Sequence, residues 1–452
     1  MNMKFDELLG LPIAPACGLL PLARVHAAGV AASAPVRGIE IAIGPMPPLL
    51  DLQMSWRALE ARAEATFFVS WSWIGAWLST LASLEQLQLV RATSEGRTVG
   101  LCVVGRRARR WRAGLSMQTL LLNATGDAVL DKITTEYNDV LCEPALAPVV
   151  RGRVVEALLQ LGNGWEELQL PGVMPSGDWA VPQRLGGLVA EVREEPCHAI
   201  DLLAVRGPEA DIEPKQATLH DRYLALLSSN TRAQIRRSIK EYAKLGELRL
   251  IEATTVAEAH AFLDELRDLH QPYWIARGEP GAFGHEYFGR FHRQLIADSF
   301  DRGEIQMLRL LAGDVLIGYL YNFVFDGRVM NYQSGFDYAP GGKHARPGLV
   351  MHSLAIALST RRGAAIYDFM AGTNRTKESL ATFQHSMQWF TLRRPTARYW
   401  IDMRLRAAKR AWKSATSRRA ANELVDSDGD GDLPVPAPVD LAKASAANIS
   451  GT

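Results

Sequence analysis

The sequence predicts an α/β fold of two tandem units, each a mixed β-sheet flanked by helices, between disordered ends. Two observations carry this prediction. The same order of predicted elements (helix, β-hairpin, strand, helix, strand) occurs in both halves of the chain. Both ends are rich in Ala, Pro, Gly and Ser and lack the apolar periodicity that a packed core requires.

Changes in composition along the chain set the expected boundaries. We expect a disordered N-terminal extension over 1–38, a first unit over 39–210, a second over 220–400, a basic helix over 401–419 and a disordered tail over 420–452. The 452 residues are 48% hydrophobic and 22% charged, which is an ordinary globular composition. The apolar residues are therefore sufficient for two sizeable cores.

In the first unit, the pattern predicts a tryptophan-rich helix over 70–84 and a second helix over 151–161. Strands are expected over 87–92, 99–104, 115–122, 167–170 and 198–203. Glu95 and Gly96 predict a tight hairpin turn between the first two strands. We interpret Trp71, Trp73 and Trp77 as core residues rather than as cofactor ligands.

In the second unit, helices are expected over 256–269, 285–300 and 349–361, the last ending at Gly363. Strands are expected over 305–311, 315–325, 329–334 and 365–370. A charged helix over 229–245 joins the two units and carries five cations against the single acid Glu241.

Charge and cysteine usage restrict the function classes. A net charge of +1 gives no overall attraction to nucleic acid, so nucleic acid is not an expected partner. The four cysteines form no CxxC motif, which argues against a metal site and favours a reduced cytoplasmic protein. The uncharged stretch 8–23 contains three prolines and is too short for a membrane helix. Asp6 and Glu7 in front of it argue against a signal peptide.

A glycine-rich turn precedes the helix predicted over 349–361. It contains Gly341, Gly342 and Gly348 together with the cations Lys343, His344 and Arg346. Glycines allow a phosphate to approach the backbone, and the free N–H groups of a helix start attract anions. The turn therefore predicts a pyrophosphate site; a flexible basic loop is the alternative.

Asp368 lies inside a short apolar strand, where an unpaired carboxylate would be costly. Lys377 is close enough in sequence to be its partner across a turn. A structural ion pair and a catalytic role for Asp368 both remain open. His352, on the helix after the glycine-rich turn, is a second candidate base.

Two further segments are candidate binding surfaces. Trp274 and Arg277 are expected on a loop between two helices, where they would suit an acceptor such as a sugar or amine; loop anchoring is the alternative. Residues 404–419 hold seven cations and no acid. This segment is either a solvated basic helix or a contact with a membrane surface or with polysaccharide-synthesis machinery.

Several runs taken together resemble a known family. They are SNTRAQIRRSIKEYAKLGELRL, LHQPYWIARGEPGAF, RGEIQMLRLLAGDVLIGYLYNFVFDGRVMNYQSGFD, PGLVMHSLAIA and YDFMAGTNRTKESL. In this order they resemble acetyltransferases associated with cellulose biosynthesis (the CelD type), a FemAB-like branch of the GNAT acyltransferase superfamily. The resemblance is strongest over 220–395 and weaker over 38–205.

This resemblance implies two GNAT-like units and an acyl transfer from acetyl-CoA or another acyl-CoA, used as co-substrate without a tightly bound cofactor. A bulged strand would bind the pantetheine arm at Tyr332, Gln333, Ser334 and Gly335. The diphosphate would lie at His344, Arg346 and Gly348. Independently of the resemblance, Asp368 and His352 are our candidate bases, and we expect Lys377 to orient Asp368 or to bind a carboxylate or phosphate of the acceptor.

The expected reaction is acyl transfer to an amine or hydroxyl of a sugar, polysaccharide or cell-envelope precursor. Two alternatives remain open. The chain is an aminoacyl-tRNA-dependent transferase, since FemAB relatives use aminoacyl-tRNA, or it is a non-catalytic partner in exopolysaccharide synthesis. The expected location is the cytoplasm, with attachment to the inner membrane surface as an open alternative.

Overall fold

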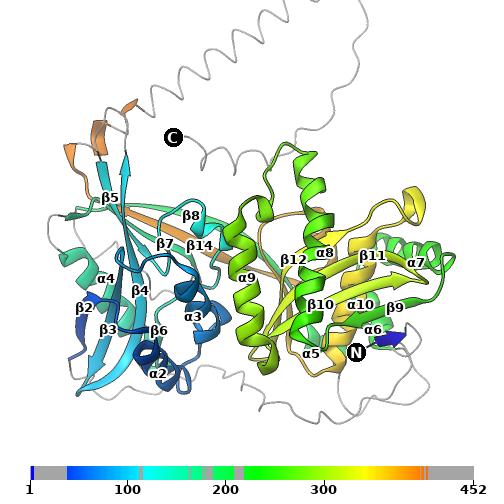
Figure 1. The fold of residues 1–452 in the computed structure, drawn as a ribbon, viewed down its shortest axis with the longest axis horizontal. Helices are drawn as coiled ribbons and strands as arrows, with labels where there is room; N and C mark the ends of the chain where they lie inside the picture. The colour runs from blue at the N-terminus through cyan, green and yellow to red at the C-terminus, as the bar shows by residue number, and fades with distance from the viewer. Residues whose placement is uncertain are drawn as a thin grey trace, which may run out of the picture.

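The computed structural model describes residues 2–4, 38–110, 116–161, 164–175, 179, 187–207, 218–397, 399–401 and 404–405. These residues form the predicted α/β fold, in which one large mixed sheet is flanked by helices (Figure 1). The tail predicted over 420–452 and most of the basic segment 401–419 lie outside the described residues.

The first half of the chain follows the predicted order, with a strand and a helix added in front. These are β2 (Glu40–Pro45) and α2 (Leu49–Glu60). The remaining elements are α3 (Trp71–Thr80), β3 (Leu87–Ser94), β4 (Arg97–Arg110), β5 (Ser116–Leu122), β6 (Leu141–Cys142), α4 (Ala147–Gln160) and β7 (Glu167–Val173). Glu95 and Gly96 form the predicted turn, with φ of 51° and 77°.

The second half repeats this order. Its elements are β9 (Leu248–Glu252), α8 (Val256–Ile275), α9 (Glu286–Ser299), β10 (Ile305–Ala312), β11 (Val315–Phe325), β12 (Arg328–Phe336), α10 (Pro347–Arg361), β13 (Ile366–Ala371) and α11 (Arg375–Leu380). Between the halves lie β8 (Val189–Asp201), α5 (Leu202–Arg206), α6 (Leu219–Leu226) and α7 (Ser229–Ala243). The chain then adds β14 (Phe383–Arg393) after α11.

Among the described residues, one 14-stranded sheet runs through both halves, with the path β1-β9-β10-β11-β12-β13-β8-β14-β7-β5-β4-β3-β2 and β6 paired to β4. Only β5–β7 and β12–β13 are parallel along this path; every other pairing is antiparallel. The parallel pair of each half is therefore the point at which a connecting helix, α4 or α10, crosses the sheet.

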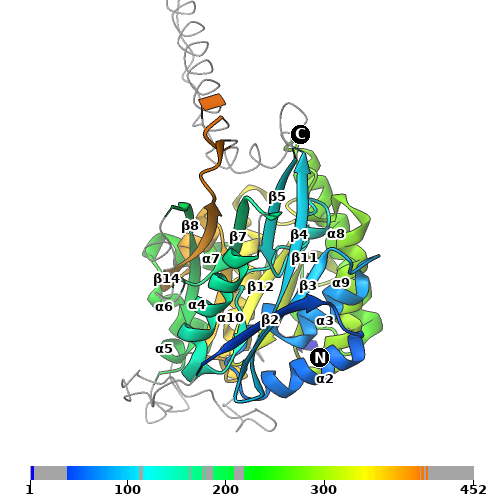
Figure 2. The ribbon, with the colours of Figure 1, turned by 90° about the vertical axis from the view of Figure 1, so that its left-hand side faces the viewer.

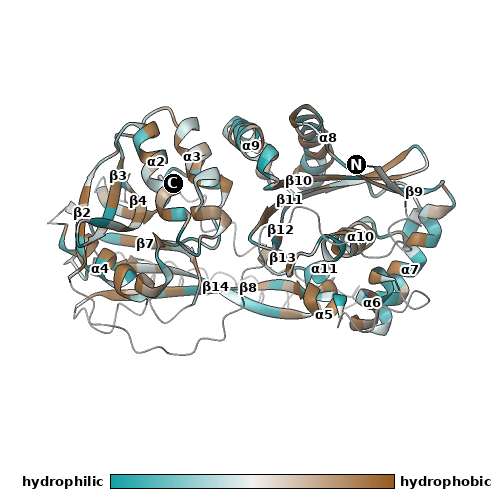
Figure 3. Cartoon of the chain, turned by 90° about the horizontal axis from the view of Figure 1, so that it is seen from below, coloured by the Kyte–Doolittle hydropathy of each residue, from teal (hydrophilic) through white to brown (hydrophobic). Residues whose placement is uncertain are grey.

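The halves exchange strands at their junction. Strand β8, which follows the first half, pairs with β13 of the second half. Strand β14, which follows the second half, pairs with β7 of the first. The two exchanged strands also pair with each other along their length and cross between the halves (Figure 3). Each half therefore depends on a strand from the other part of the chain.

Helices cover both faces of the sheet. In the first half, α4 lies on one face and α2 and α3 on the other (Figure 2). In the second half, α8 and α9 cover one face, while α10 lies on the opposite face with α5, α6 and α7 (Figure 3). From Pro347 to Thr360, α10 is buried on nearly all sides, which explains its long uncharged sequence.

The core that contains α3 also joins the two halves. Trp71, Trp73 and Trp77 are all buried, as predicted. Trp73 packs against Phe291 of α9 with ring centroids 4.8 Å apart. Phe67 stacks on Phe323 of β11 at 4.4 Å. Burying such a side chain contributes roughly 1.5–3 kcal/mol, so this aromatic cluster is a major part of the contact between the halves.

The structure corrects two expectations about segment boundaries. The helix expected to end at residue 269 continues through Pro272 to Ile275 as α8, so Trp274 is helical rather than in a loop. Proline lacks a backbone N–H, but the surrounding helix tolerates the loss of one hydrogen bond near its end. At the N-terminus, where disorder was expected, Asn2–Lys4 form the short strand β1 on the edge of β9. The rest of that extension lies outside the described residues.

Candidate active site

The parallel strands β12 and β13 separate after a short contact. They pair only at Arg328↔Ile366, Val329↔Tyr367 and Met330↔Asp368. Beyond these pairs, β12 stays with β11 and β13 stays with β8. Within the described residues, no strand pairs with this side of β12 from Asn331 to Phe336. Backbone groups along that edge therefore have no strand partner, and the Gln333 carbonyl accepts a hydrogen bond from Asn331 Nδ2 at 3.4 Å.

A bulge shapes the same part of β12. Tyr321 pairs with Gln333, but Asn322 pairs with Asn331, so Tyr332 is an extra residue on β12. The bulge falls in the segment where the sequence resemblance placed one. A chain of amides fixes the register: Asn331 Nδ2 donates to Asn322 Oδ1, and Asn322 Nδ2 donates to Gln306 Oε1, both at 2.9 Å.

The residues predicted to contact the pantetheine arm have different environments on β12. Gln333 and Ser334 are half-buried. The Tyr332 ring packs among aromatic side chains, and its hydroxyl donates to the carbonyl of Ile133 from the first half. Gly335 is required by packing, because a Cβ there would lie 2.7 Å from the carbonyl oxygen of Leu266 in α8.

The glycine-rich turn leads directly into α10. Gly341 and Gly342 have φ of 77° and 71°, a region that glycine adopts without strain. Arg346 is the residue before the helix, and its Nη1 donates to the carbonyls of Lys343 and Ala345, both at 2.9 Å. No described side chain caps the start of α10. The first N–H groups of a long helix therefore remain available for an anion.

The surroundings of this helix start are suited to an anion. Lys343, His344 and Arg346 are exposed cations or potential cations. The Tyr242 hydroxyl is buried without a hydrogen-bond partner among the described residues. The Tyr242 ring lies 3.0 Å from the position that a Cβ of Gly341 would occupy. Gly348 places the first turn against the Phe336 ring, which a Cβ would approach to 3.3 Å.

Asp368 is fully buried, and its ion-pair partner is Arg328 at 2.6 Å. The predicted pairing with Lys377 is therefore wrong: Lys377 Nζ donates instead to the Ala371 carbonyl, at 2.8 Å. The Asp368 carboxylate also accepts hydrogen bonds from the Tyr137 hydroxyl at 2.6 Å and from the Met370 N–H at 2.7 Å. Three donors thus satisfy this carboxylate, and one of them comes from the first half.

His352 lies in the core of α10, where its Nδ1 is 3.0 Å from the Tyr367 hydroxyl. Burial lowers the pKa of His352 to about 3, so the ring is neutral at physiological pH. The ring packs against Phe336 and Phe369. His352 therefore packs as a buried core residue.

Sequence reasoning missed one acidic residue near the separation of β12 and β13. Glu136 comes from the first half and is 8% exposed. Its Oε2 accepts a hydrogen bond from the Ala371 N–H at 2.8 Å, at the end of β13. Burial raises the pKa of Glu136 to about 7, although the Ala371 N–H and the charge of Lys377 lower it. No local pattern marks this position, because the contact joins residues 235 positions apart.

Lys377 belongs to the same group of charges. Burial lowers its pKa, and the nearby Glu136 and Asp368 raise it. Lys377 occupies the first turn of α11, which Asn374 caps by accepting from the Lys377 backbone N–H at 2.8 Å. The short helix therefore fixes the lysine beside the end of β13.

Trp274 and Arg277 belong to an exposed aromatic surface at the end of α8. Arg277 lies 3.5 Å from the ring centre of Tyr273, which stacks on Tyr338 at 5.6 Å. Trp274 and Ile275 are 38% and 64% exposed. Because Tyr338 follows β12, this surface adjoins the end of the strand whose edge is open.

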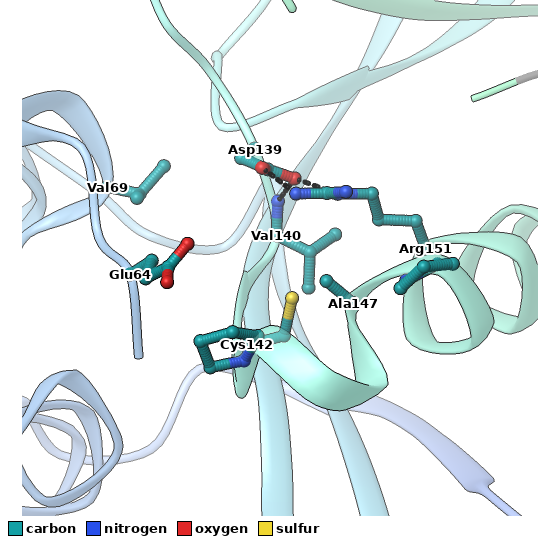
Figure 4. Close-up of a pocket in the computed structure, with 9 residues that line it drawn as sticks. Glu64, Val69, Asp139, Val140, Cys142, Ala147 and Arg151 are labelled. Carbon is teal, nitrogen blue, oxygen red and sulfur yellow. Dashed lines mark hydrogen bonds and ion pairs between the residues drawn. The ribbon is translucent and has the colours of Figure 1, made fainter. Parts of the chain in front are cut away.

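One pocket lies apart from these residues, in the first half (Figure 4). The ion pair between Asp139 and Arg151, at 2.5 Å, forms part of its wall. Glu64, Val69 and Cys142 also line it. None of the predicted site residues borders this pocket.

Two further properties concern the described residues alone. No three His, Cys, Asp or Glu side chains among them are arranged to hold a metal ion. No described helix combines the length and apolar character that crossing a bilayer demands.

Solved structures with similar folds have low sequence identity to this chain. FemX is 9% identical, with a TM-score of 0.47, and the alignment covers 78% of this chain and 96% of FemX. A C-terminal domain of a putative lysylphosphatidylglycerol synthetase from Agrobacterium fabrum is 11% identical, with a TM-score of 0.44 and coverages of 78% and 95%. A tandem GNAT protein from the clavulanic acid biosynthesis pathway is 14% identical, with a TM-score of 0.37 and coverages of 78% and 98%.

Among curated proteins, no sequence matches this chain. A family model does match residues 229–378, the segment from α7 to the middle of α11, and its description is acetyltransferase (GNAT) domain. This segment contains the open edge of β12, the glycine-rich turn and the start of α10. Over residues 229–378, the chain is therefore similar to GNAT-type acetyltransferase domains.

Proposed function

We propose that the protein transfers an acyl group from acetyl-CoA or another acyl-CoA to an amine or hydroxyl of a sugar, polysaccharide or cell-envelope precursor. The observation that carries this proposal is the separation of β12 from β13, which leaves a bulged strand edge leading to an uncapped helix start. An extended pantetheine arm carries amides that can pair with a strand edge, and its diphosphate suits a helix N-terminus.

The proposed donor site assigns a role to each part of the segment. Backbone groups of Asn331–Phe336 bind the pantetheine arm, and the N–H groups of Gly348 and Leu349 bind the diphosphate. Lys343, His344 and Arg346 add positive charge beside it. The thioester carbon then lies near the point where β13 leaves β12. Holding donor and acceptor there in line supplies much of the rate enhancement of a direct transfer.

The acceptor is proposed to enter from the side that carries the aromatic surface of Tyr273, Trp274 and Tyr338. Aromatic rings with an adjacent guanidinium suit the apolar faces and hydroxyls of a sugar. The finer proposals follow the sequence resemblance: a CelD-type acetyltransferase that works in exopolysaccharide synthesis, in the cytoplasm or at the inner face of the membrane.

Ligand binding tests the donor. We expect CoA and acetyl-CoA to raise the melting temperature of the whole chain and to bind with one site per chain by calorimetry. Arg346→Glu and Lys343→Glu should each weaken CoA binding, because each reverses a charge beside the diphosphate. Lys343→Glu changes no side chain that makes the Arg346 hydrogen bonds. It therefore separates the effect of charge on CoA binding from the effect of a distorted loop. Arg153→Glu, on the exposed surface of α4, is the matched control and should bind CoA normally.

The aminoacyl-tRNA alternative has an observation of its own. Helix α7 exposes Arg236, Arg237 and Lys240, and the exposed Lys244 follows its last residue; these cations could bind phosphates. Saturable tRNA binding that weakens steeply with salt, together with no binding of any CoA thioester, would replace the acyl-CoA proposal. The acyl-CoA proposal would be supported if the unmodified chain binds CoA and binds tRNA no more tightly than the Arg237→Glu variant does.

A further inference from the structure

The parallel strand pair of the first half has the same arrangement as β12 and β13, but its separation is filled. Strands β5 and β7 pair at three positions from Thr119 to Leu121 and then diverge. Asn138 lies between them: its Nδ2 donates to the carbonyls of Leu122 and Pro171, both at 3.0 Å. Its backbone N–H donates to the Gly172 carbonyl at 2.9 Å. An extended ligand therefore finds these strand edges already occupied.

The segment that fills the first half also reaches the second half. The Ile133 carbonyl accepts the hydrogen bond of Tyr332 on β12. Glu136 accepts from the Ala371 N–H on β13, at 2.8 Å, and the Tyr137 hydroxyl donates to Asp368 at 2.6 Å. Residues 133–137 thus contact both strands that separate. They form a wall of the second-half site built from the first half.

The backbone of this wall is held in uncommon conformations. Thr134 and Tyr137 have φ of 46° and 47°, and Met370, on the facing bulge of β13, has φ of 62°. Residues other than glycine in this region are strained, and such strain concentrates at functional sites. Several interactions over-determine the wall: Tyr137 also contacts His385 at 2.8 Å, and Asn138 is anchored between β5 and β7.

We propose that Glu136, delivered by the first half, is the general base that takes the proton from the acceptor amine or hydroxyl. The inference rests on the proposed acyl transfer and adds a catalytic residue to it. Its carboxylate accepts from the Ala371 N–H at the end of β13, three residues beyond the last pair with β12 and near the position proposed for the thioester carbon. The other carboxylate of the cluster is that of Asp368. It already accepts hydrogen bonds from Arg328, Tyr137 and Met370.

The acceptor nitrogen or oxygen attacks the thioester carbon and loses its proton to Glu136. The C–S bond breaks, its electron pair leaves with the sulfur, and the CoA thiolate takes a proton from solvent. Glu136 then returns its proton to solvent. The products are the acylated acceptor and free CoA.

The surroundings of Glu136 suit this role. Burial holds its pKa at about 7, so the carboxylate and the acid are both populated near neutral pH. Lys377 opposes this rise in pKa and Asp368 adds to it. The other titratable or charged groups of the cluster come from the first half and from β8, β12 and β14; they are Tyr137, Cys197, Arg328, Tyr332 and His385.

The test compares Glu136→Gln with the whole unmodified chain over pH 5–9, using acetyl-CoA and a panel of amino sugars and sugar alcohols as acceptors. In the unmodified protein, the turnover number should rise about tenfold per pH unit below about pH 7 and then level off. Glu136→Gln should lower turnover by about 10²-fold or more and remove this limb. Its CoA affinity should stay unchanged. The surface variant Glu156→Gln is the control and should keep both rate and profile.

Two outcomes overturn the inference: turnover of Glu136→Gln within about threefold of the parent, or a pH limb that survives the substitution. If Glu136→Gln does not fold, the turnover of Glu136→Ala is measured at increasing concentrations of formate. A rate that rises with formate concentration supports a missing carboxylate base, and a rate that does not rise contradicts it. If the unmodified chain binds no CoA thioester, the proposed acyl-CoA-dependent function itself is contradicted.

Discussion

Asp368 shows how a single residue ties the two halves together. Its carboxylate receives hydrogen bonds from Arg328 on β12, Met370 on β13 and Tyr137 of the first half. A fully buried carboxylate is tolerated only when such donors replace water. These contacts favour a structural role for Asp368 over the role of a base. Glu136, whose carboxylate accepts from the Ala371 N–H, is then the better candidate for proton transfer.

The residue-scale prediction follows from this arrangement. Asp368→Asn removes the charge that Arg328 and Tyr137 both face and places an NH₂ group among donors. We expect the free energy of unfolding to fall by about 3 kcal/mol, the lower end for a broken buried ion pair, because Arg328 is partly exposed. Urea denaturation measures this change.

Asp326→Asn, in the exposed turn between β11 and β12, is the control. It should be nearly neutral, because Asn also accepts the φ of 45° found there. An Asp368→Asn protein with parental stability but greatly reduced turnover would restore the catalytic reading of Asp368.

At the scale of elements, the path of β12 depends on how closely α8 approaches it. Gly335 lies under the α8 backbone, and Gly318 lies on the neighbouring strand, where a Cβ would come within 2.6 Å of the Gly335 carbonyl. Small residues on both strands thus bring helix and sheet together. The same approach places the exposed end of α8, with Trp274, beside the end of β12.

The element-scale prediction concerns this approach. Gly335→Ala puts a methyl group 2.7 Å from the Leu266 carbonyl, which belongs to backbone and can move only with α8. We expect a loss of about 1–3 kcal/mol in stability, as for other overpacked sites, and weaker CoA binding as β12 shifts. Thermal unfolding and calorimetry with CoA give the two values.

Gly289→Ala supplies the comparison within α9, since a Cβ there meets no atom within 4 Å. It should raise stability by about 0.5–1 kcal/mol through helix propensity alone. Equal effects of the two substitutions would show that α8 does not constrain β12.

At the scale of the whole molecule, the exchange of β8 and β14 makes the halves interdependent. Without β8, strand β13 would lose a neighbour, and without β14 so would β7. A long strand with an unpaired edge can pair with another chain, and the protein then aggregates. The aromatic packing of Trp73 against Phe291 adds to the same junction.

The corresponding prediction compares two truncated chains. Residues 38–405 should unfold in a single cooperative transition by heat or urea. Residues 218–397, which contain the second half without β8, should aggregate or lack a cooperative transition. Circular dichroism and size-exclusion chromatography distinguish the cases. A folded, monomeric 218–397 with a sharp transition would refute the interdependence.

Much of the fold could be predicted from the sequence because its signals are local. The turn at Glu95–Gly96 uses residues suited to positive φ, and it forms a hairpin in the structure. The helix α10 and its end at Gly363, with φ of 87°, follow from an uncharged run and a terminal glycine. In the candidate site, the glycine-rich turn is a local signal of the same kind, and the bulge near Tyr332 lies where the family resemblance placed it.

Contacts between residues far apart in the sequence follow from the tertiary structure alone. Arg328 as the partner of Asp368 lies 40 positions away, and Tyr137 lies 231 positions away. The placement of Glu136 beside Ala371 and the exchange of β8 with β14 have no local pattern at all. Turn chemistry and periodicity act over a few residues, so they determine elements and their order. Which side chains meet depends on how the strands of the two halves pair, and that pairing is a property of the folded chain.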